Sequence, residues 1–487
     1  MAANQSLPVR GWLLPSVSHW LWLLLLMMLL SQPWRTAMVA SDGDTCMHWR
    51  VGEWMLEHRH IIPANVFSHT KSGQPIVSKE WLSEVIFAAA GRVAGLFGLA
   101  VVAALVIATT FALVHRQLLR AGNDLIVTTA VTLLGVWAAS MHWLARPHVF
   151  SFLMIFLWNE ALRRYEHDGR AGKLAVMLAV LTALWVNLHG GFLAGFLVLG
   201  AYWAGVALER RWDRVRTLAA IGALCAVASL LNPSGYKLHL HSLAFLRSDY
   251  LTGWLAEYSS ANFHSAGTLG FLAWLGLTFF TLVVCRPRLP ASAGLLLISW
   301  TYYALYASRN IPLLVIVAAP ILAPAWSAVL PERWRTLSAR LRRINDMSAG
   351  WPVVLAAATA FVIFAPHPTE MTADRWPVKA VEFIRQHPQD FAGNMFNQYL
   401  WGGYLMEVLP EHKTFVDGRT DFFGEDLIRE FSDTTALRMN WGAPLEKYNV
   451  QWTLMPSDHR LNQALALLSA WRCAYSDEVA VVYWRPL

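Results

Sequence analysis

Residues 96–114 read LFGLAVVAALVIATTFALV, without a single charged side chain. A stretch of this length and composition can cross a lipid bilayer as a helix, which needs roughly 20 mostly apolar residues. Similar stretches recur along the chain, so the sequence predicts an all-α polytopic membrane protein with about eleven transmembrane helices. The other stretches are 12–30, 125–143, 148–162, 173–187, 190–208, 217–231, 268–284, 291–306, 311–330 and 351–366.

The overall composition also indicates a membrane protein. Of the 487 residues, 56% are hydrophobic and only 15% are charged. A soluble protein of this size cannot hide so much apolar surface, because its exterior has to carry polar groups. The formal net charge of +7 does not indicate a nucleic-acid partner. The basic residues lie in short clusters between apolar stretches, where they govern membrane orientation.

The first apolar stretch is interpreted as a retained helix. Its apolar run is longer than the central region of a typical secretory signal, and Met38-Val39-Ala40 is a poor cleavage site. We therefore expect residues 12–30 to remain in the mature protein as the first transmembrane helix.

Lysine and arginine residues in the short loops predict the orientation of the helices. On one side of the membrane the short loops contain only Arg146, Lys237, Arg247 and Arg309, whereas the alternate loops are strongly basic. The basic loops and the N-terminus are expected to face the cytoplasm, so the chain after Pro366 lies outside it. The basic loops hold Arg116 and Arg120; Arg163, Arg164, Arg170 and Lys173; Arg210, Arg211, Arg214 and Arg216; Arg286 and Arg288; and Arg333, Arg335, Arg340, Arg342 and Arg343.

This orientation divides the chain into two regions. Residues 1–366 are predicted to form the transmembrane domain, including a long first outer loop at 31–95. Within this loop, residues 80–91 are apolar but too short to span, and they carry Glu80 and Glu84 one helical turn apart. Counting them as a span would also place the arginine clusters outside the cytoplasm. An amphipathic helix lying at the membrane interface is the better interpretation.

The second region, residues 372–487, has a different pattern. Short apolar strands alternate with helical stretches, which is typical of a small α/β domain. The expected strands are Asn394–Asn397, Thr414–Val416, Gln451–Met455 and Val479–Tyr483, and the expected helices include Val378–Gln386 and Asp426–Phe431.

Polar residues that a membrane protein does not need for folding gather at the predicted outer face. They follow or precede at least five of the expected spans, whereas the predicted cytoplasmic loops carry arginine and little else. Convergence of this kind indicates a binding or catalytic site. The residue types are carboxylates able to act as a base, together with arginine and histidine able to bind a phosphate. The main candidates are Asp42, Asp44, Glu80, Arg146, His148, Asn187, His189, Arg309 and Asn310.

The first outer loop resembles that of the GT-C glycosyltransferases. The shared features are Asp44 followed by an amphipathic helix, then Pro63, then an interfacial helix introduced by Lys79-Glu80-Trp81. The nearest likenesses are the protein O-mannosyltransferases and the lipid A aminoarabinose transferases, which take a sugar from a polyprenyl-phosphate carrier at the outer face. The resemblance covers residues 1–170 in motif and order, and the rest of the chain in general layout.

The resemblance implies roles for individual residues. Asp44 matches the first-loop aspartate that acts as catalytic base, and Arg146 lies where the family places a polar group after the third span. Two positions depart from the family pattern. The aspartate common after that span is His148 here, and the Lys-Pro-Pro pattern is replaced by Lys79-Glu80-Trp81.

Asp44 and Glu80 each have a structural alternative to a catalytic role. Asp44 precedes a predicted helix and is suited to capping its N-terminus. The resemblance favours base catalysis, and one residue can do both. Glu80 is either a second catalytic acid or the cap of the 81–91 helix.

Several residues are candidates for binding the carrier phosphate or substrate. Arg146 and His148 either bind phosphate or anchor the chain among lipid headgroups. Asn187 and His189 either contact substrate or belong to a tight turn at Gly190-Gly191. Arg309 and Asn310 open a helix, whose N-terminal N–H groups favour an anion.

The leading hypothesis is a membrane glycosyltransferase that moves a sugar from a polyprenyl-phosphate carrier to an acceptor hydroxyl with inversion. Its partners would be membrane lipid, the lipid-linked sugar, and a glycan, lipid or protein acceptor. No cofactor and no metal ligand are assigned, and a divalent metal requirement stays open. The alternatives are a non-catalytic assembly protein, or a transporter or flippase of lipid-linked sugars. No span carries the acid at mid-membrane that transport would favour.

Overall fold

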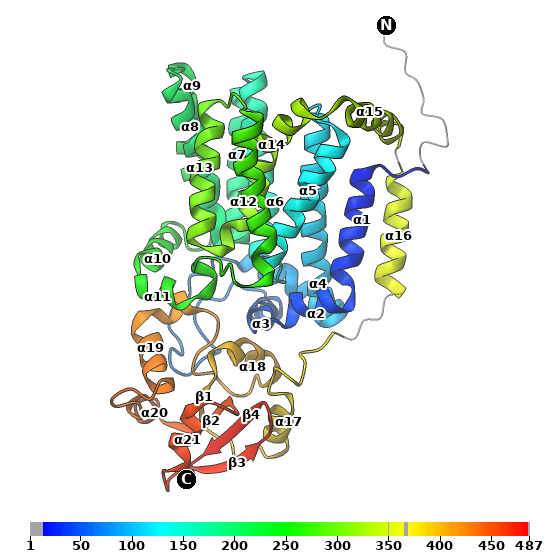
Figure 1. Cartoon of the computed structure of the whole chain (residues 1–487). Coiled ribbons are helices and arrows are strands. Elements are labelled where there is room, and N and C mark those ends of the chain that lie inside the picture. Colours follow the sequence, from blue (N-terminus) through cyan, green and yellow to red (C-terminus); the bar gives the residue numbers. More distant parts are fainter. Residues whose placement is uncertain (1–12, 349, 365–368, 486–487) are drawn as a thin grey trace.

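A computed structural model describes residues 13–348, 350–364 and 369–485. It is a bundle of long helices with a small α/β domain at one end (Figure 1). We call the end that carries this domain the outer end and the opposite end the inner end. Helix α15, Glu332–Asp346, lies at the inner end and holds five of the predicted cytoplasmic arginines.

Each predicted span corresponds to a helix of the bundle. By length and apolar composition, six of the described helices qualify as spans, or up to eight if the bent pairs α1–α2 and α15–α16 each count as one. The predicted class, a helical membrane protein with several spans, is confirmed. The helices at the predicted spans are α1 Val17–Leu30, α4 Trp81–Arg120, α5 Leu125–Ala139, α6 His148–Asp168, α7 Ala171–Leu188, α8 Leu193–Leu208, α9 Trp212–Ala228, α12 Leu269–Phe280, α13 Ala291–Tyr306, α14 Ile311–Val329 and α16 Trp351–Phe364.

Helix α4 contains the predicted interfacial segment and the second predicted span, separated by a break. Ala94 and Gly95 have non-helical backbone angles, and Gly95 has a φ of 58°. Gly98 packs directly against the carbonyl of Ala90, where an added Cβ would overlap that oxygen. Glycine at both positions therefore lets the chain fold sharply between the two halves.

The C-terminal domain is built on a sheet of order β1-β2-β4-β3. β1 and β2 are parallel, and the other two pairs are antiparallel. Three predicted strands are confirmed, but β3 was not predicted. The strand expected at Thr414–Val416 is wrong, because Thr414 forms only an isolated bridge with Ser68 of the first outer loop. The strands are β1 Asn394–Asn397, β2 Val450–Pro456, β3 Arg472–Ser476 and β4 Ala480–Trp484, and the helices are α17 Val378–Gln386, α18 Gly402–Val408, α19 Thr420–Thr435, α20 Ala443–Lys447 and α21 Arg460–Ala466.

The first outer loop lies between the bundle and the C-terminal domain. Its helix α2, Gln32–Ala40, contacts α1 and α4 of the bundle, and its helix α3, Asp44–His58, contacts α4 above and α18 below (Figure 1). The close approach of α18 to α3 depends on glycine, because a Cβ at Gly403 would overlap the carbonyl of Gly43. On the other side, α10, Tyr236–Arg247, and α11, Asp249–Trp254, contact α19.

Candidate active site

Arg146 is the centre of a cluster of three carboxylates at the outer end. Its Nε and Nη2 atoms lie 3.2 and 3.0 Å from the two Asp42 oxygens. Nη2 is 2.5 Å from Asp44 Oδ2 and Nη1 is 3.2 Å from Glu257 Oε2. Only 16% of the Arg146 side chain is exposed. Planar guanidinium groups suit this simultaneous pairing, because their five N–H donors are fixed in a fork.

Three separate elements bring these groups together. Asp42 follows α2, Asp44 is the first residue of α3, and Glu257 lies in the 3-10 helix Ala256–Tyr258. Arg146 lies between the 3-10 helix Ser140–His142 and α6. The cluster therefore forms only when the first outer loop and the loop around Glu257 fold onto the bundle.

Asp44 does not cap the helix that it begins. Gly43 occupies the N-cap position, and no side chain makes a capping hydrogen bond there. Instead, the Asp44 N–H donates to Asp42 Oδ1 at 3.0 Å, and the Asp44 carboxylate faces Arg146. The capping interpretation of Asp44 is therefore wrong, and its side chain is available for another role.

The environment of Asp44 favours a proton-accepting role near neutral pH. Loss of water around its carboxyl, together with the neighbouring Asp42 charge, outweighs the attraction of Arg146 and raises the pKa of Asp44 to about 6. A base whose pKa lies near the working pH accepts protons efficiently. By contrast, although burial opposes ionisation, the charges of Arg309 and Arg146 hold the pKa of Glu257 well below its usual range.

Glu257 extends the cluster to a second arginine. Its Oε1 lies 3.0 Å from Arg309 Nη1, so one carboxylate connects both guanidinium groups. The Arg309 guanidinium also stacks over the Tyr258 ring, 4.5 Å from its centroid. Sequence reasoning missed Glu257. The available signal was that only Asp249 and Glu257 are acidic between residues 229 and 268.

Beside this cluster, two glutamates of the α4 N-terminus face two histidines. His48 Nδ1 lies 3.1 Å from Glu84 Oε1 and 4.0 Å from Glu80 Oε2, and His189 Nε2 lies 3.6 Å from Glu80 Oε1. Glu80 occupies the N-cap position of α4, but its side chain makes no capping hydrogen bond. The capping interpretation of Glu80 is therefore wrong as well.

His48, Glu80 and Glu84 are also the described residues best placed to hold a divalent ion. All three are largely buried, and their ligand atoms lie within 4.8 Å of one another. A proton on His48 is the alternative way to balance the charges of the two glutamates. Burial opposes the charged form of the His48 ring, but the hydrogen bond to Glu84 and the charge of Glu80 raise the pKa of His48. Sequence reasoning missed the role of His48, which lies four residues after Asp44 on the same helix face.

The polar atoms of other predicted site residues make hydrogen bonds to other parts of the bundle. His148 Nε2 donates to the His142 carbonyl at 3.0 Å. Asn187 accepts from Trp81 Nε1 at 2.6 Å and donates to the carbonyls of Ala183 and Leu231. Asn310 Nδ2 donates to the carbonyl of Tyr303 at 3.0 Å. These residues hold the outer ends of the helices together.

His189 faces Glu80 with one ring nitrogen, since its Nε2 lies 3.6 Å from Glu80 Oε1. Its Nδ1 accepts from the Gly191 N–H at 3.0 Å, so Nδ1 carries no proton. The Ser151 hydroxyl therefore donates to Nδ1 at 2.8 Å, while its oxygen accepts from Trp185 Nε1. Burial, followed by the charges of Arg309 and Lys79, lowers the pKa of His189 well below its usual value. The ring is therefore neutral, with its proton on Nε2 and two cations nearby.

The C-terminal domain closes over the cluster. Lys79 Nζ and His241 Nε2 each lie 2.7 Å from Asp421 Oδ2, which links the first outer loop and α10 to α19. Gly418 packs against the Asp44 carboxylate so closely that a Cβ there would overlap it. The Asp417-Gly418-Arg419 segment therefore forms one wall of the site around Asp44.

The fold is similar to those of an archaeal oligosaccharyltransferase and a bacterial ArnT. The oligosaccharyltransferase of Archaeoglobus fulgidus, in its apo form, superposes with a TM-score of 0.52 and 12% identity over 90% of this chain and 70% of that one. ArnT from Cupriavidus metallidurans, bound to undecaprenyl phosphate, superposes with a TM-score of 0.51 and 14% identity over 96% of both chains. At these identities the comparison establishes the fold.

A second structure of the Archaeoglobus fulgidus oligosaccharyltransferase, AglB, holds an inhibitory peptide and a dolichol-phosphate, and it superposes with a TM-score of 0.50 and 13% identity over 92% of this chain and 70% of that one. No protein-family model and no curated protein sequence matches the chain. The fold that the resemblance implied is thus confirmed by structural similarity, without detectable sequence similarity.

Proposed function

We propose that the protein is a membrane glycosyltransferase that moves a sugar from a polyprenyl-phosphate carrier to an acceptor hydroxyl at the outer membrane face. The observation that carries this proposal is the position of Asp44. It is a partly buried carboxyl that does not cap its own helix and that pairs with Arg146 at the outer end of a GT-C fold. Structures of this fold that hold dolichol-phosphate and undecaprenyl phosphate support the class of donor.

Asp44 would act as the general base. It takes the proton of the acceptor hydroxyl while that oxygen attacks the anomeric carbon of the sugar. The bond between the anomeric carbon and the carrier phosphate oxygen breaks, and the carrier phosphate leaves with the bonding electrons. Attack from the face opposite the departing phosphate inverts the configuration. Asp44 therefore has to lie on the acceptor side of the sugar.

The charge distribution suggests which cations would bind the phosphate. Arg146 already faces three carboxylates, so we assign it to holding Asp44 in place. Arg309 faces Glu257 alone among the described acids, and Lys79 faces Asp421. The charges of both cations act on His189, whose Nε2 lies 3.6 Å from Glu80 Oε1. Fixed donors in a site with little water stabilise a leaving phosphate strongly.

The site could also use a divalent ion, with His48, Glu80 and Glu84 as the residues that would hold it. Such an ion would add positive charge beside His189 and the proposed phosphate position. The residues of this chain would still supply the base and the fixed cations.

The proposal is tested with purified full-length protein and radiolabelled polyprenyl-phosphate sugars. Transfer of label to an acceptor and release of free carrier phosphate are measured for the wild type, for Asp44→Asn and for Asp249→Asn. Asp249 is an exposed acid at the start of α11, outside the cluster, and serves as a matched control.

We expect Asp44→Asn to lower transfer by roughly 100-fold or more, with Asp249→Asn close to the wild type. If the protein binds the carrier but transfers no sugar, and Asp44→Asn leaves the binding unchanged, the result would instead favour the non-catalytic assembly protein. Movement of the lipid-linked sugar across vesicles without bond cleavage would favour the transporter.

A further inference from the structure

A cavity of about 500 Å³ lies at the inner end of the bundle, far from the candidate active site. It is bounded by the end of α4, by α6, by the segment before α13, and by α13 and α14. Its volume is within the range typical of small-molecule sites. Because it opens at the predicted cytoplasmic ends of the helices, it lies at the depth of lipid headgroups.

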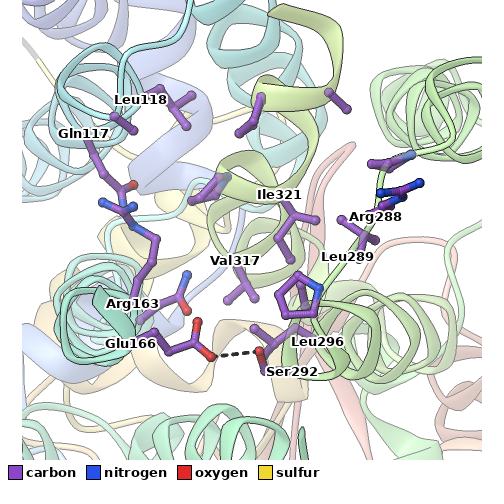
Figure 2. A pocket seen from close by; sticks show the side chains of 18 of the residues that line it. Gln117, Leu118, Arg163, Glu166, Arg288, Leu289, Ser292, Leu296, Val317 and Ile321 are labelled. Carbon is purple, nitrogen blue, oxygen red and sulfur yellow. Dashed lines mark hydrogen bonds between the residues drawn. The ribbon is translucent and has the colours of Figure 1, made fainter. Parts of the chain in front are cut away.

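The walls of this cavity are of two kinds. Figure 2 shows Gln117, Arg163 and Glu166 along one side, with Leu289 and Arg288 on the opposite side. Val317 and Ile321 of α14 and Leu296 of α13 make the wall between them apolar. An apolar wall that ends in polar and charged groups suits a molecule that is itself amphipathic.

Glu166 adds a negative charge to the same side. Its carboxylate accepts from the Ser292 hydroxyl at 3.1 Å, and no lysine or arginine in the described ranges comes within ion-pair distance of it. Arg163, by contrast, is paired with Glu160 at 3.0 Å. The polar side of the cavity therefore offers a carboxylate that has no ion pair among the described residues.

Arg288 supplies the opposite charge at the rim. It is exposed, lines the cavity, and makes no ion pair with any residue that the structure describes. The cavity therefore presents acceptors inside, a cation at its edge, and an apolar wall beside both. Pockets of basic residues between membrane helices on the cytoplasmic side are typical sites for phospholipid headgroups.

We propose that this cavity binds one phosphatidylethanolamine molecule from the inner leaflet. Its ammonium group would donate to Glu166, its phosphate would face Arg288, and its acyl chains would follow the apolar wall. A primary ammonium has three N–H donors, whereas the quaternary nitrogen of phosphatidylcholine has none. Phosphatidylglycerol has hydroxyl donors but no positive charge to balance Glu166.

The test measures lipid retained by the purified full-length protein. Delipidated protein is incubated with equimolar vesicles of phosphatidylethanolamine, phosphatidylcholine and phosphatidylglycerol, then repurified, and bound lipid is counted by native mass spectrometry. The variants are Glu166→Gln and Arg288→Gln. Arg286→Gln is the matched control, because Arg286 lies two residues away but does not line the cavity.

We expect retention of phosphatidylethanolamine over phosphatidylcholine by roughly tenfold, the ratio that one charge-assisted hydrogen bond provides. Glu166→Gln should abolish this preference, Arg288→Gln should weaken retention of phosphatidylethanolamine, and Arg286→Gln should change neither. Arg288 is exposed, so its variant remains informative if Glu166→Gln misfolds. The proposal would be overturned if the protein retained the three lipids equally or preferred phosphatidylglycerol. It would also be overturned if the preference for phosphatidylethanolamine survived both Glu166→Gln and Arg288→Gln.

Discussion

At the residue scale, Arg146 decides the electrostatics of the candidate site. Asp42, Asp44 and Glu257 would repel one another strongly if they faced each other with no cation between them. A single guanidinium pairs with all three. The arginine therefore fixes the position of Asp44 and keeps part of its negative charge available at neutral pH.

Replacing Arg146 with glutamine should destabilise the protein markedly. Three carboxylates would lose their shared cation in a largely buried place, and removal of one partner from a buried pair costs about 3–5 kcal/mol. We expect a clear drop in the thermal unfolding midpoint in detergent. Adding Asp42→Asn to this variant should recover part of the loss, since one repelling charge is removed and Arg146 is the only cation with which Asp42 pairs among the described residues. An Arg146→Gln protein as stable as the wild type would contradict this account.

The raised pKa of Asp44 predicts the pH dependence of transfer. Only the ionised carboxylate can accept the proton of an acceptor, so activity should rise with pH as Asp44 loses its own proton, with a midpoint at about pH 6. The measurement is kcat/KM against pH for the wild type. If Asp44 is not the base, the profile should be flat through this range.

At the element scale, the break in α4 separates two environments. The half before Ala94 is tied to the first outer loop through Glu80 and Glu84, and the half after Gly95 belongs to the bundle. Two carboxylates facing His48 would be costly inside hydrocarbon. The break therefore agrees with the prediction that residues 80–91 lie along the membrane interface.

Single cysteines at the two ends of α4 test this arrangement. Val93 and Ala121 are both exposed, in the first half and just after the second. In a background where exposed Cys473 is replaced by serine, Val93→Cys should react with a membrane-impermeant reagent added outside. Ala121→Cys should react only after permeabilisation. Labelling of Ala121→Cys from outside, with Val93→Cys reacting only after permeabilisation, would mean that the first half also crosses.

At the scale of the whole molecule, the C-terminal domain completes the site. Gly418 packs against Asp44, Asp421 pairs with Lys79, and Gly403 packs against Gly43. These contacts join residues more than 300 positions apart in the chain. Docking of this domain and formation of the site are therefore expected to be coupled.

A bulkier residue at Gly403 should loosen this docking. We expect Gly403→Ala to increase proteolysis between the bundle and the C-terminal domain and to lower transfer, because its Cβ would overlap the carbonyl of Gly43. Gly442→Ala is the control, since nothing lies within 4 Å of a Cβ at that position. The two variants should behave alike if α18 does not pack tightly on α3 in solution.

The orientation of the whole molecule is tested by a fusion at its end. The C-terminal domain and α15, with its arginines, lie at opposite ends of the bundle (Figure 1). Because basic loops stay in the cytoplasm, a reporter active only in the cytoplasm should be silent when fused after residue 487. A bright reporter there would reverse the topology and place the candidate site inside the cell.

The sequence by itself determined the parts of this protein that depend on composition and on the spacing of apolar residues. The lengths of the apolar stretches predicted the helices, and the distribution of arginine residues predicted the orientation. Asp44, Arg146 and Arg309 were recognised as polar groups at helix ends. Strands with strong β patterns, such as Asn394–Asn397, were also found. These features are local, so nearby residues are enough to specify them.

Only the tertiary structure decided which of these groups meet. Glu257 and His48 have no local motif, and they matter because folding brings them to Arg146, Glu80 and Glu84. Thr414 reads as part of a strand, but it pairs with Ser68 through a single isolated bridge. Charges interact through space, so partners far apart in the chain are set by the packing of helices and not by their spacing in the sequence.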